Sequence, residues 1–274
     1  MILFIFEGER REPKLYNTIR QLFLPQDIND ILCTYKSNIY SLYSRLKGYD
    51  VFDEIDNAGN TVSVLNQILL SNGDSTLDNI PVSDISEIYL FFDYDFHHNR
   101  GTLESNNDHI REMLEYFNDE TGNGKLYINY PMVDSIRYTK SLPDADYKVY
   151  NISRDQCSDF KNLTAQFSVY PSLDHILISN NTNESAQSCE LHNKDVLSNW
   201  VHLIGMNMYK ANYICTMQYC CPQSLENISQ SNIFNNQLLK YVETDNCCVA
   251  ILNAFPIFIA DYIGLNKTRI LYGL

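Results

Sequence analysis

Acidic residues directly follow two apolar segments that are typical of buried strands. Glu7 follows Ile2 to Phe6, and both Asp93 and Asp95 come soon after Ile88 to Phe92. Because side chains alternate along an extended chain, the two aspartates are expected to share one face, with Cα atoms about 7 Å apart. Neighbouring carboxylates repel each other, so either one holds a proton or a cation lies between them. Oxygen ligands of this kind suit Mg²⁺ or Mn²⁺.

An Asp-x-Asp pair alone is a weak signal, because a strand that ends at the surface often carries solvated acids. Glu7 strengthens the metal-site interpretation. If the two strands are neighbours, three carboxylates meet at one edge of the sheet. Gly8 would let the backbone turn sharply at this point.

Asp134 is a fourth acidic candidate, because it follows the apolar segment Leu126 to Asn129. Arg137 and Lys140 lie about one and two helical turns further on. A cation there could offset the charge that develops on a phosphoryl group. The alternative is that Asp134 is a surface helix residue. Solvated helix faces are likewise an alternative for the basic residues near the acids, which are Arg10, Arg11, Lys14, Arg137 and Lys140.

The first half of the chain alternates between strand and helix patterns. The expected strands are Ile2 to Phe6, Ile31 to Tyr35, Ile88 to Phe92 and Leu126 to Asn129. The expected helices are Glu12 to Leu24, a segment capped by Ser37, Val62 to Leu70, and Leu103 to Phe117. This alternation predicts an α/β fold with a four-stranded, mostly parallel sheet and helices on both faces. Sites in such sheets form beyond the carboxyl ends of the strands.

The pattern changes after Lys140. Residues Ser141 to Glu190 are polar and rich in loop-forming residues. Three helical stretches follow, at Asp195 to Tyr213, Ser224 to Tyr241 and Cys248 to Tyr262. We therefore expect a catalytic core at 1–140 and a mainly helical subdomain or cap at 141–274.

The charge and hydropathy of the chain limit the classes of partner. A formal net charge of −14 argues against a protein whose whole surface binds nucleic acid, but it is compatible with a local basic groove. Cys247 to Ala260 is the longest apolar run and falls short of the roughly 20 residues that span a bilayer. The chain shows no signal peptide, which predicts a cytoplasmic, reduced protein without a membrane partner.

Two further groups of residues have metal-ligand chemistry. His97 and His98 follow Asp95 closely and could bind Mn²⁺ or donate protons, or could simply line a loop. Cys215, Cys220, Cys221, Cys247 and Cys248 have no standard zinc spacing, so reduced core cysteines are the favoured interpretation.

The acidic motifs, in a four-stranded α/β core, resemble those of the Toprim domain. Phe6-Glu7-Gly8-Glu9 and Phe92-Asp93-Tyr94-Asp95 carry the resemblance, which covers Met1 to Lys140. This domain occurs in topoisomerases, primases, OLD-type nucleases and several bacterial anti-phage effectors. The chain departs from the pattern in the long stretch between its second and third strands. It shows no zinc finger or helicase module, which argues against a topoisomerase or primase.

The resemblance implies that Glu7, Asp93 and Asp95 hold one or two divalent metal ions beside a phosphodiester. By the same resemblance, Asp134 stands for a further acid of the nuclease branch. Lys140 is the first candidate for the lysine that these nucleases often use, and Lys14 is the second.

The hypothesis from the sequence is a Mg²⁺- or Mn²⁺-dependent nuclease acting on DNA or RNA, tRNA included. By resemblance it would be an effector of bacterial anti-phage defence, controlled by a partner ATPase. The chain has no G-x-x-x-x-G-K-[ST] motif, so any ATP hydrolysis would come from such a partner. A non-catalytic binding or regulatory module and a metal-dependent phosphatase are the alternatives, and assembly into a homo-oligomer stays open.

Overall fold

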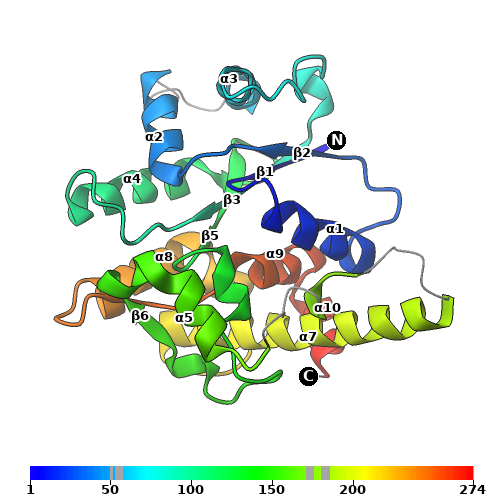
Figure 1. Cartoon of the computed structure of the whole chain (residues 1–274). Coiled ribbons are helices and arrows are strands. Elements are labelled where there is room, and N and C mark those ends of the chain that lie inside the picture. Colours follow the sequence, from blue (N-terminus) through cyan, green and yellow to red (C-terminus); the bar gives the residue numbers. More distant parts are fainter. Residues whose placement is uncertain (50–51, 53–57, 171–175, 180–185, 274) are drawn as a thin grey trace.

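A five-stranded mixed sheet forms the centre of the molecule (Figure 1). The structure, a computed structural model, describes residues 1–49, 52, 58–170, 176–179 and 186–273. In the order β2-β1-β3-β5-β4, the first four strands are parallel and β4 is antiparallel to β5. The strands are β1 (Ile2–Phe6), β2 (Asp30–Thr34), β3 (Glu87–Asp93), β4 (Asn118–Asp119) and β5 (Gly124–Asn129).

The α/β class and the mostly parallel sheet agree with the prediction, but the expected number of strands was wrong. The additional strand, β4, is two exposed polar residues long, so it lacks the apolar pattern that marks a buried strand. It pairs through Asn118 with Lys125 and through Asp119 with Gly124.

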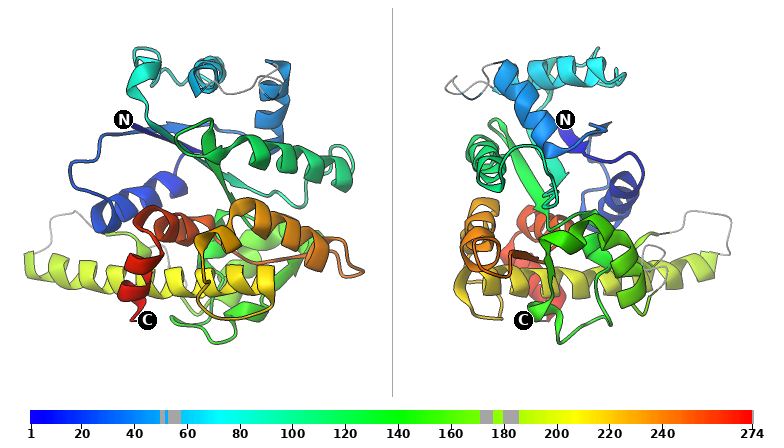
Figure 2. Two further views of the ribbon diagram at one scale, coloured as in Figure 1. Left: turned by 180° about the vertical axis from the view of Figure 1, so that it is seen from behind. Right: turned by 60° about the vertical axis from the view of Figure 1, so that its left-hand side comes forward.

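Helices lie on both faces of the sheet, as the alternation predicts (Figures 1 and 2). Helix α2 begins one residue later than expected, because Asn38 rather than Ser37 caps it: the Asn38 side chain accepts a 2.9 Å hydrogen bond from the Ser41 N–H. The helices of the first half are α1 (Arg11–Phe23), α2 (Ile39–Gly48), α3 (Ala58–Ser71) and α4 (Leu103–Tyr116), with a 3-10 turn η2 (Val82–Asp84).

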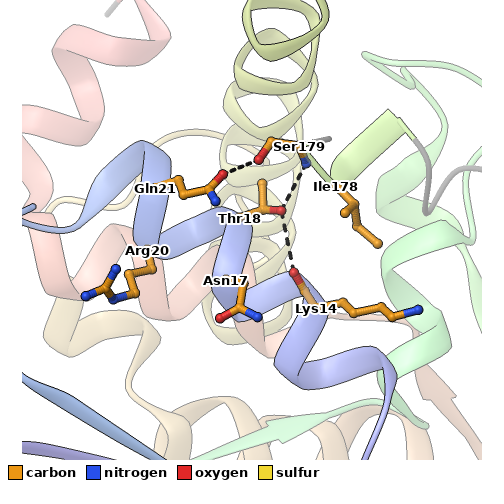
Figure 3. A pocket seen from close by; sticks show the side chains of 7 residues that line it. All are labelled: Lys14, Asn17, Thr18, Arg20, Gln21, Ile178 and Ser179. Atoms are coloured by element: carbon orange, nitrogen blue, oxygen red, sulfur yellow. Dashed lines mark hydrogen bonds between the residues drawn. The ribbon is translucent and has the colours of Figure 1, made fainter. Parts of the chain in front are cut away.

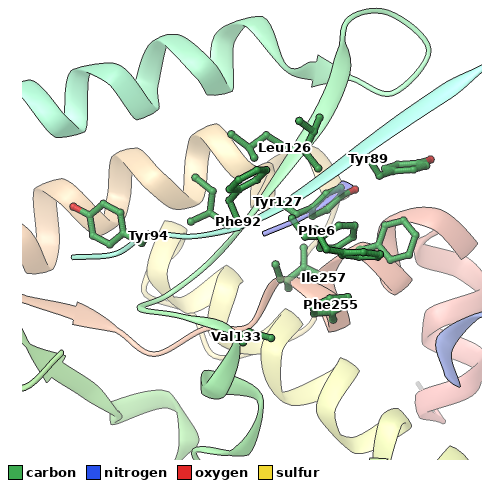
Figure 4. Packing of buried hydrophobic residues seen from close by; sticks show 14 of the residues in the cluster. Phe6, Tyr89, Phe92, Tyr94, Leu126, Tyr127, Val133, Phe255 and Ile257 are labelled. Carbon is green, nitrogen blue, oxygen red and sulfur yellow. The ribbon is translucent and has the colours of Figure 1, made fainter. Parts of the chain in front are cut away.

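One face of the sheet is built from aromatic rings (Figure 4). Phe91 stacks on Phe255 with ring centroids 4.7 Å apart. Phe258 packs edge-on against Phe4 and Phe91 at 5.8 and 5.3 Å. Each ring is buried, and burial of a phenylalanine stabilises the fold by about 1.5–3 kcal/mol. Because Phe255 and Phe258 come from the C-terminal part of the chain, this layer fixes that part against the sheet.

The C-terminal half contains short elements and one long helix, α7, which runs on the side of the molecule opposite α2 and α3 (Figure 2). Its elements are η3 (Val133–Arg137), η4 (Tyr147–Val149), β6 (Asn151–Ser153), η5 (Arg154–Asp159), α5 (Phe160–Phe167), α7 (Ala186–Thr216), η6 (Leu225–Ile228), α8 (Gln230–Gln237), η7 (Leu238–Val242), β7 (Cys248–Ala250), α9 (Ala254–Ile263) and α10 (Leu265–Tyr272). Among the described residues, no helix is both long and apolar enough to cross a membrane.

The helix expected over Cys248 to Tyr262 is wrong at its beginning. Residues Cys248–Ala250 form strand β7, which pairs antiparallel with β6, and α9 starts only after Asn253. The Asn253 side chain caps α9 by accepting a hydrogen bond from the Phe255 N–H. The whole run is apolar, and periodicity alone cannot separate a buried strand from a buried helix in such a run. Residues from both halves of the chain contribute to one hydrophobic core. The division into two parts at residue 140 stays a prediction.

Candidate functional site at the carboxyl edge of the sheet

Glu7 and Asp93 meet because their strands are neighbours in the sheet. Strands β1 and β3 are parallel, with Phe6 paired to Phe91, so both acids leave the sheet at its carboxyl edge. Glu7 donates its backbone N–H to Phe91 O at 3.0 Å, and Glu7 Oε2 accepts the Asp93 N–H at 2.9 Å. Of the three carboxylates predicted to meet at this edge, Glu7 and Asp93 therefore lie together in the fold.

Asp93 is held by groups from the next strand and the turn after it. Its Oδ1 accepts hydrogen bonds from Asn129 Nδ2 at 3.1 Å and from the Val133 N–H at 2.8 Å. Asn129 is the register partner of Asp93 on β5, and its own Oδ1 accepts the Ala254 N–H at the start of α9. The site is thus tied to the C-terminal half through Asn129, a residue that the sequence reasoning missed.

The two carboxyl groups are poorly compensated. Burial raises the pKa of Glu7 well above its usual range, and the charges of Asp93 and Asp95 add to the effect. The pKa of Asp93 is also raised well above its usual range, first by burial and then by Glu12 and Asp95. No basic side chain in the described part of the chain forms an ion pair with either acid. Their neighbourhood therefore favours a proton or a bound cation.

Asp95 does not share a face with Asp93 in the way an extended strand would require. Strand β3 ends at Asp93, and Asp95 has a left-handed backbone conformation with φ +48°. Tyr94 is buried between them, with its N–H bonded to Asn129 O at 3.0 Å. The expectation of alternation was wrong because the chain leaves the strand before Asp95. Asp95 still acts on the site through its charge, since it raises the pKa of both Glu7 and Asp93.

The two histidines that follow Asp95 are close enough to influence its pKa. Burial raises the pKa of Asp95, and the opposing influences are His97, His98 and Lys161. His98 stacks on Tyr40 with ring centroids 4.4 Å apart, and burial lowers the pKa of this histidine. These contacts give His98 a packing role.

Glu12 is an acid of the site that the sequence reasoning did not select. Its side chain is buried, and Glu12 Oε1 accepts the Gly8 N–H at 3.2 Å. Burial raises its pKa, and its charge in turn raises the pKa of Asp93. A Cβ atom on Gly8 would lie 2.6 Å from Glu12 Oε2, so a larger residue at position 8 would displace the Glu12 carboxylate. A glutamate in the first helical turn gave no signal of its own, because helices commonly begin with acids.

Asp134 is buried and is neutralised by two arginines. Its Oδ1 accepts a hydrogen bond from Arg137 Nη2 at 2.7 Å and forms an ion pair with Arg11. The side chain of Asp134 is 1% exposed, which differs from the surface helix alternative. Arg137 lies one turn on, as the spacing predicts. Arg11 comes from the first turn of α1.

Most of these acids line a pocket of about 690 Å³ at the carboxyl edge, whereas Asp95 lies outside its described lining. Lys14 and Lys161 take part in it, whereas Lys140 lies outside its described lining. The Lys140 ammonium instead sits over the ring of Phe167, 5.1 Å from the centroid. The lining residues are Glu7, Gly8, Glu9, Arg10, Arg11, Glu12, Lys14, Asp93, Val133, Asp134, Arg137, Lys161 and Ile178.

Two carboxylates would suit an open magnesium site rather than a closed protein cage. The described residues contain no group of three His, Cys, Asp or Glu side chains that could hold a metal ion. Mg²⁺, however, usually takes one or two carboxylates and completes its shell with waters and substrate phosphates. Glu7 and Asp93 each use one oxygen in the hydrogen bonds above, which leaves the second oxygen of each without a described hydrogen-bond partner. The cysteines whose side chains are described are free thiols.

Comparison with known proteins identified no relative of this chain. No family model, no curated protein and no solved structure matches the chain.

Proposed function

We propose that this protein is a Mg²⁺- or Mn²⁺-dependent phosphodiester hydrolase whose metal is held by Glu7 and Asp93. One observation carries the proposal. Two hydrogen-bonded strand-end acids with raised pKa values, and with no described ion-pair partner, face a pocket that also contains basic side chains. An acid pair of this kind favours a cation, and the basic side chains favour an anionic substrate.

A divalent metal ion bound there would polarise a phosphoryl oxygen and lower the pKa of a bound water. Asn129 and the Val133 N–H would keep the Asp93 carboxylate in one orientation through their hydrogen bonds. Lys14 and Lys161 would attract the substrate phosphates as flexible point charges. Arg11 and Arg137 would keep Asp134 neutralised and thereby limit the negative charge in the pocket.

The order of the acids along the chain supports the Toprim resemblance. The resemblance implies a glutamate after the first strand and an Asp-x-Asp motif after a later one, and here Glu7 follows β1 while Asp93 ends the neighbouring β3. A nuclease that acts in anti-phage defence under a partner ATPase remains part of this proposal. In it, Lys14 and Lys161 replace Lys140 as the candidate lysines, because both line the pocket.

The test is cleavage of labelled single-stranded DNA, duplex DNA and tRNA in Mg²⁺ or Mn²⁺. We expect cleavage by the wild-type protein and a loss of about 10²-fold or more in Glu7→Gln and Asp93→Asn. Asp245→Asn, which changes an exposed acid, is the matched control and should keep full activity. Equal cleavage by all four proteins would contradict the proposed site.

A phosphatase acting on a small phosphomonoester is the second candidate. The pocket volume of about 690 Å³ favours it, because small-molecule sites commonly have volumes of about 300–1,000 Å³. Release of phosphate from p-nitrophenyl phosphate, without cleavage of any nucleic acid, would decide for this function.

A further inference from the structure

A second hollow adjoins the pocket along helix α1 (Figure 3). It has a volume of about 310 Å³, and it shares Lys14 and Ile178 with the larger pocket. Ser179 closes one side by donating its backbone N–H to Thr18 Oγ1 at 3.1 Å. Because two residues line both spaces, the hollow continues the surface that begins at Glu7 and Asp93.

The exposed stripe of α1 joins the two spaces. Lys14, Asn17 and Gln21 are exposed and follow one another at intervals of three and four residues, so they lie on one face of the helix, and the exposed Arg10 directly precedes it. Lys14, Asn17 and Gln21 line the hollow, and Arg10 and Lys14 line the larger pocket.

The cations of this surface are available to a ligand. Among the described residues, Arg10, Lys14 and Lys161 form no ion pair, whereas Arg20 is occupied by Asp30. In a chain of formal net charge −14, cations without a carboxylate partner at one pocket mark a local anion-binding surface.

We infer that this surface binds the phosphates of a single-stranded nucleic acid on one side of the bond that reacts at Glu7 and Asp93. The strand would pass Arg10 and Lys161 and continue along Lys14 into the hollow beside Asn17 and Gln21. This inference rests on the proposed function, and it adds the substrate class and the direction in which the strand leaves the site.

The shape and chemistry of the lining favour a single strand that is read through its backbone. Glu7 and Asp93 are half-buried in a pocket, so a phosphate must enter it, which a flexible strand does more easily than a stiff duplex. None of the described residues that line the two spaces is aromatic, so bases have no stacking platform there. Binding should therefore depend on charge and little on sequence.

The binding test uses a fluorescein-labelled oligonucleotide of about ten nucleotides, in single-stranded and duplex form. Ca²⁺ replaces Mg²⁺, because it takes the same oxygen ligands. For the wild-type protein we expect log K to fall with log salt at a slope of about −2, from three cations at about −0.7 each on a single strand. Lys14→Gln should reduce that slope by about 0.7, and Lys14→Gln with Lys161→Gln by about 1.4.

Two variants serve as controls for the binding test. Lys14→Arg keeps the charge and should restore the wild-type slope. Lys267→Gln removes an exposed lysine on α10, outside the described lining of both spaces, and should change nothing. Equal slopes for wild type and Lys14→Gln, or tighter binding of the duplex than of the single strand, would overturn the inference.

Hydrolysis of bis(p-nitrophenyl) phosphate separates the failure of this inference from that of the proposed function. This small diester has no flanking phosphates, so Lys14→Gln should raise KM for the oligonucleotide by a larger factor than it raises KM for the diester. An equal loss of activity toward both substrates would contradict a phosphate-binding surface beside the site, but it would not contradict the proposed hydrolase function. If the wild type hydrolyses neither substrate, the proposed function fails, and the salt dependence of binding still decides whether the surface exists.

Discussion

Two sets of carboxylates at the same pocket are stabilised in opposite ways. Asp134 is buried between two arginines, Arg11 and Arg137. Glu7 and Asp93 are half-buried and receive only amide N–H groups. A carboxylate removed from water costs free energy unless a cation or hydrogen bonds compensate it. The comparison separates a buried acid that is ion-paired within the chain from two acids that have no described ion-pair partner.

The difference is the reason for placing the proposed metal site at Glu7 and Asp93 rather than at Asp134. Asp134 has its counter-charge inside the chain, so it contributes to the fold in any solution that keeps the arginines protonated. Glu7 and Asp93 would gain their counter-charge from outside, and their raised pKa values show that the ionised pair is unfavourable without it. Acids arranged at a cost to stability are typical of functional sites.

The largest expected effect of a substitution at this pocket is on the ion cluster. Asp134→Ala removes the carboxylate shared by Arg11 and Arg137 and should lower the free energy of unfolding by about 3–5 kcal/mol. Urea denaturation measures this. Asp108→Ala, which breaks the exposed pair with Arg111, is the matched control and should cost less than about 1 kcal/mol. Equal losses in both variants would remove the distinction between the two kinds of carboxylate.

A smaller effect is expected from the residue that orients Asp93. Asn129→Ala removes the donor to Asp93 Oδ1 and the acceptor of the Ala254 N–H, and should cost about 1–3 kcal/mol. Hydrolysis should fall less than in Asp93→Asn, because the carboxylate itself remains. Denaturation and turnover of the same preparation test both statements, and unchanged values would contradict the positioning role.

Substitution of an acid of the pair should change the free energy of unfolding in the opposite direction to substitution of Asp134. Without metal, Glu7→Gln removes one of two repelling charges and should raise the free energy of unfolding by about 0.5–2 kcal/mol, as is common at sites where activity costs stability. Thermal unfolding in EDTA measures the change. A loss of stability in this variant would mean that Glu7 is stabilising as a carboxylate, against the present account.

The smallest effect is the pH dependence of the metal-free protein. Between the usual carboxyl pKa of about 4 and the raised pKa values of Glu7 and Asp93, the folded state binds more protons than the unfolded state. The contribution of the pair to stability is therefore present at low pH and is lost as the pH rises through the raised values. The wild type should lose more stability than Glu7→Gln between mildly acidic and mildly alkaline pH. If the free energy of unfolding changed with pH in the same way in both proteins, the predicted direction of the pH dependence would be contradicted.

The parts of the fold that follow from local pattern were predictable from the sequence. Strands β1 and β3 were predictable from their uniformly apolar runs, and the acids Glu7 and Asp93 at their ends from the rule for the carboxyl edge. Strand β4 was not predictable, because two exposed polar residues carry no such pattern.

The rest of the site depends on contacts between distant parts of the chain. Asn129 reaches Asp93 through sheet register, and Lys161 reaches the pocket from α5, far along the sequence. The prediction for Lys140 assumed a regular α-helix after β5. The chain instead forms the short 3-10 helix η3, which ends at Arg137, so the assumed helical spacing does not hold at Lys140.

The most direct test of the central claim is titration of the metal-free protein with Mg²⁺ and Mn²⁺ by calorimetry. We expect binding to the wild type and to the surface control Asp245→Asn. In Glu7→Gln and Asp93→Asn, binding should be weakened by at least about tenfold. Equal affinity in all four proteins, or no binding by the wild type, would contradict a metal site at Glu7 and Asp93.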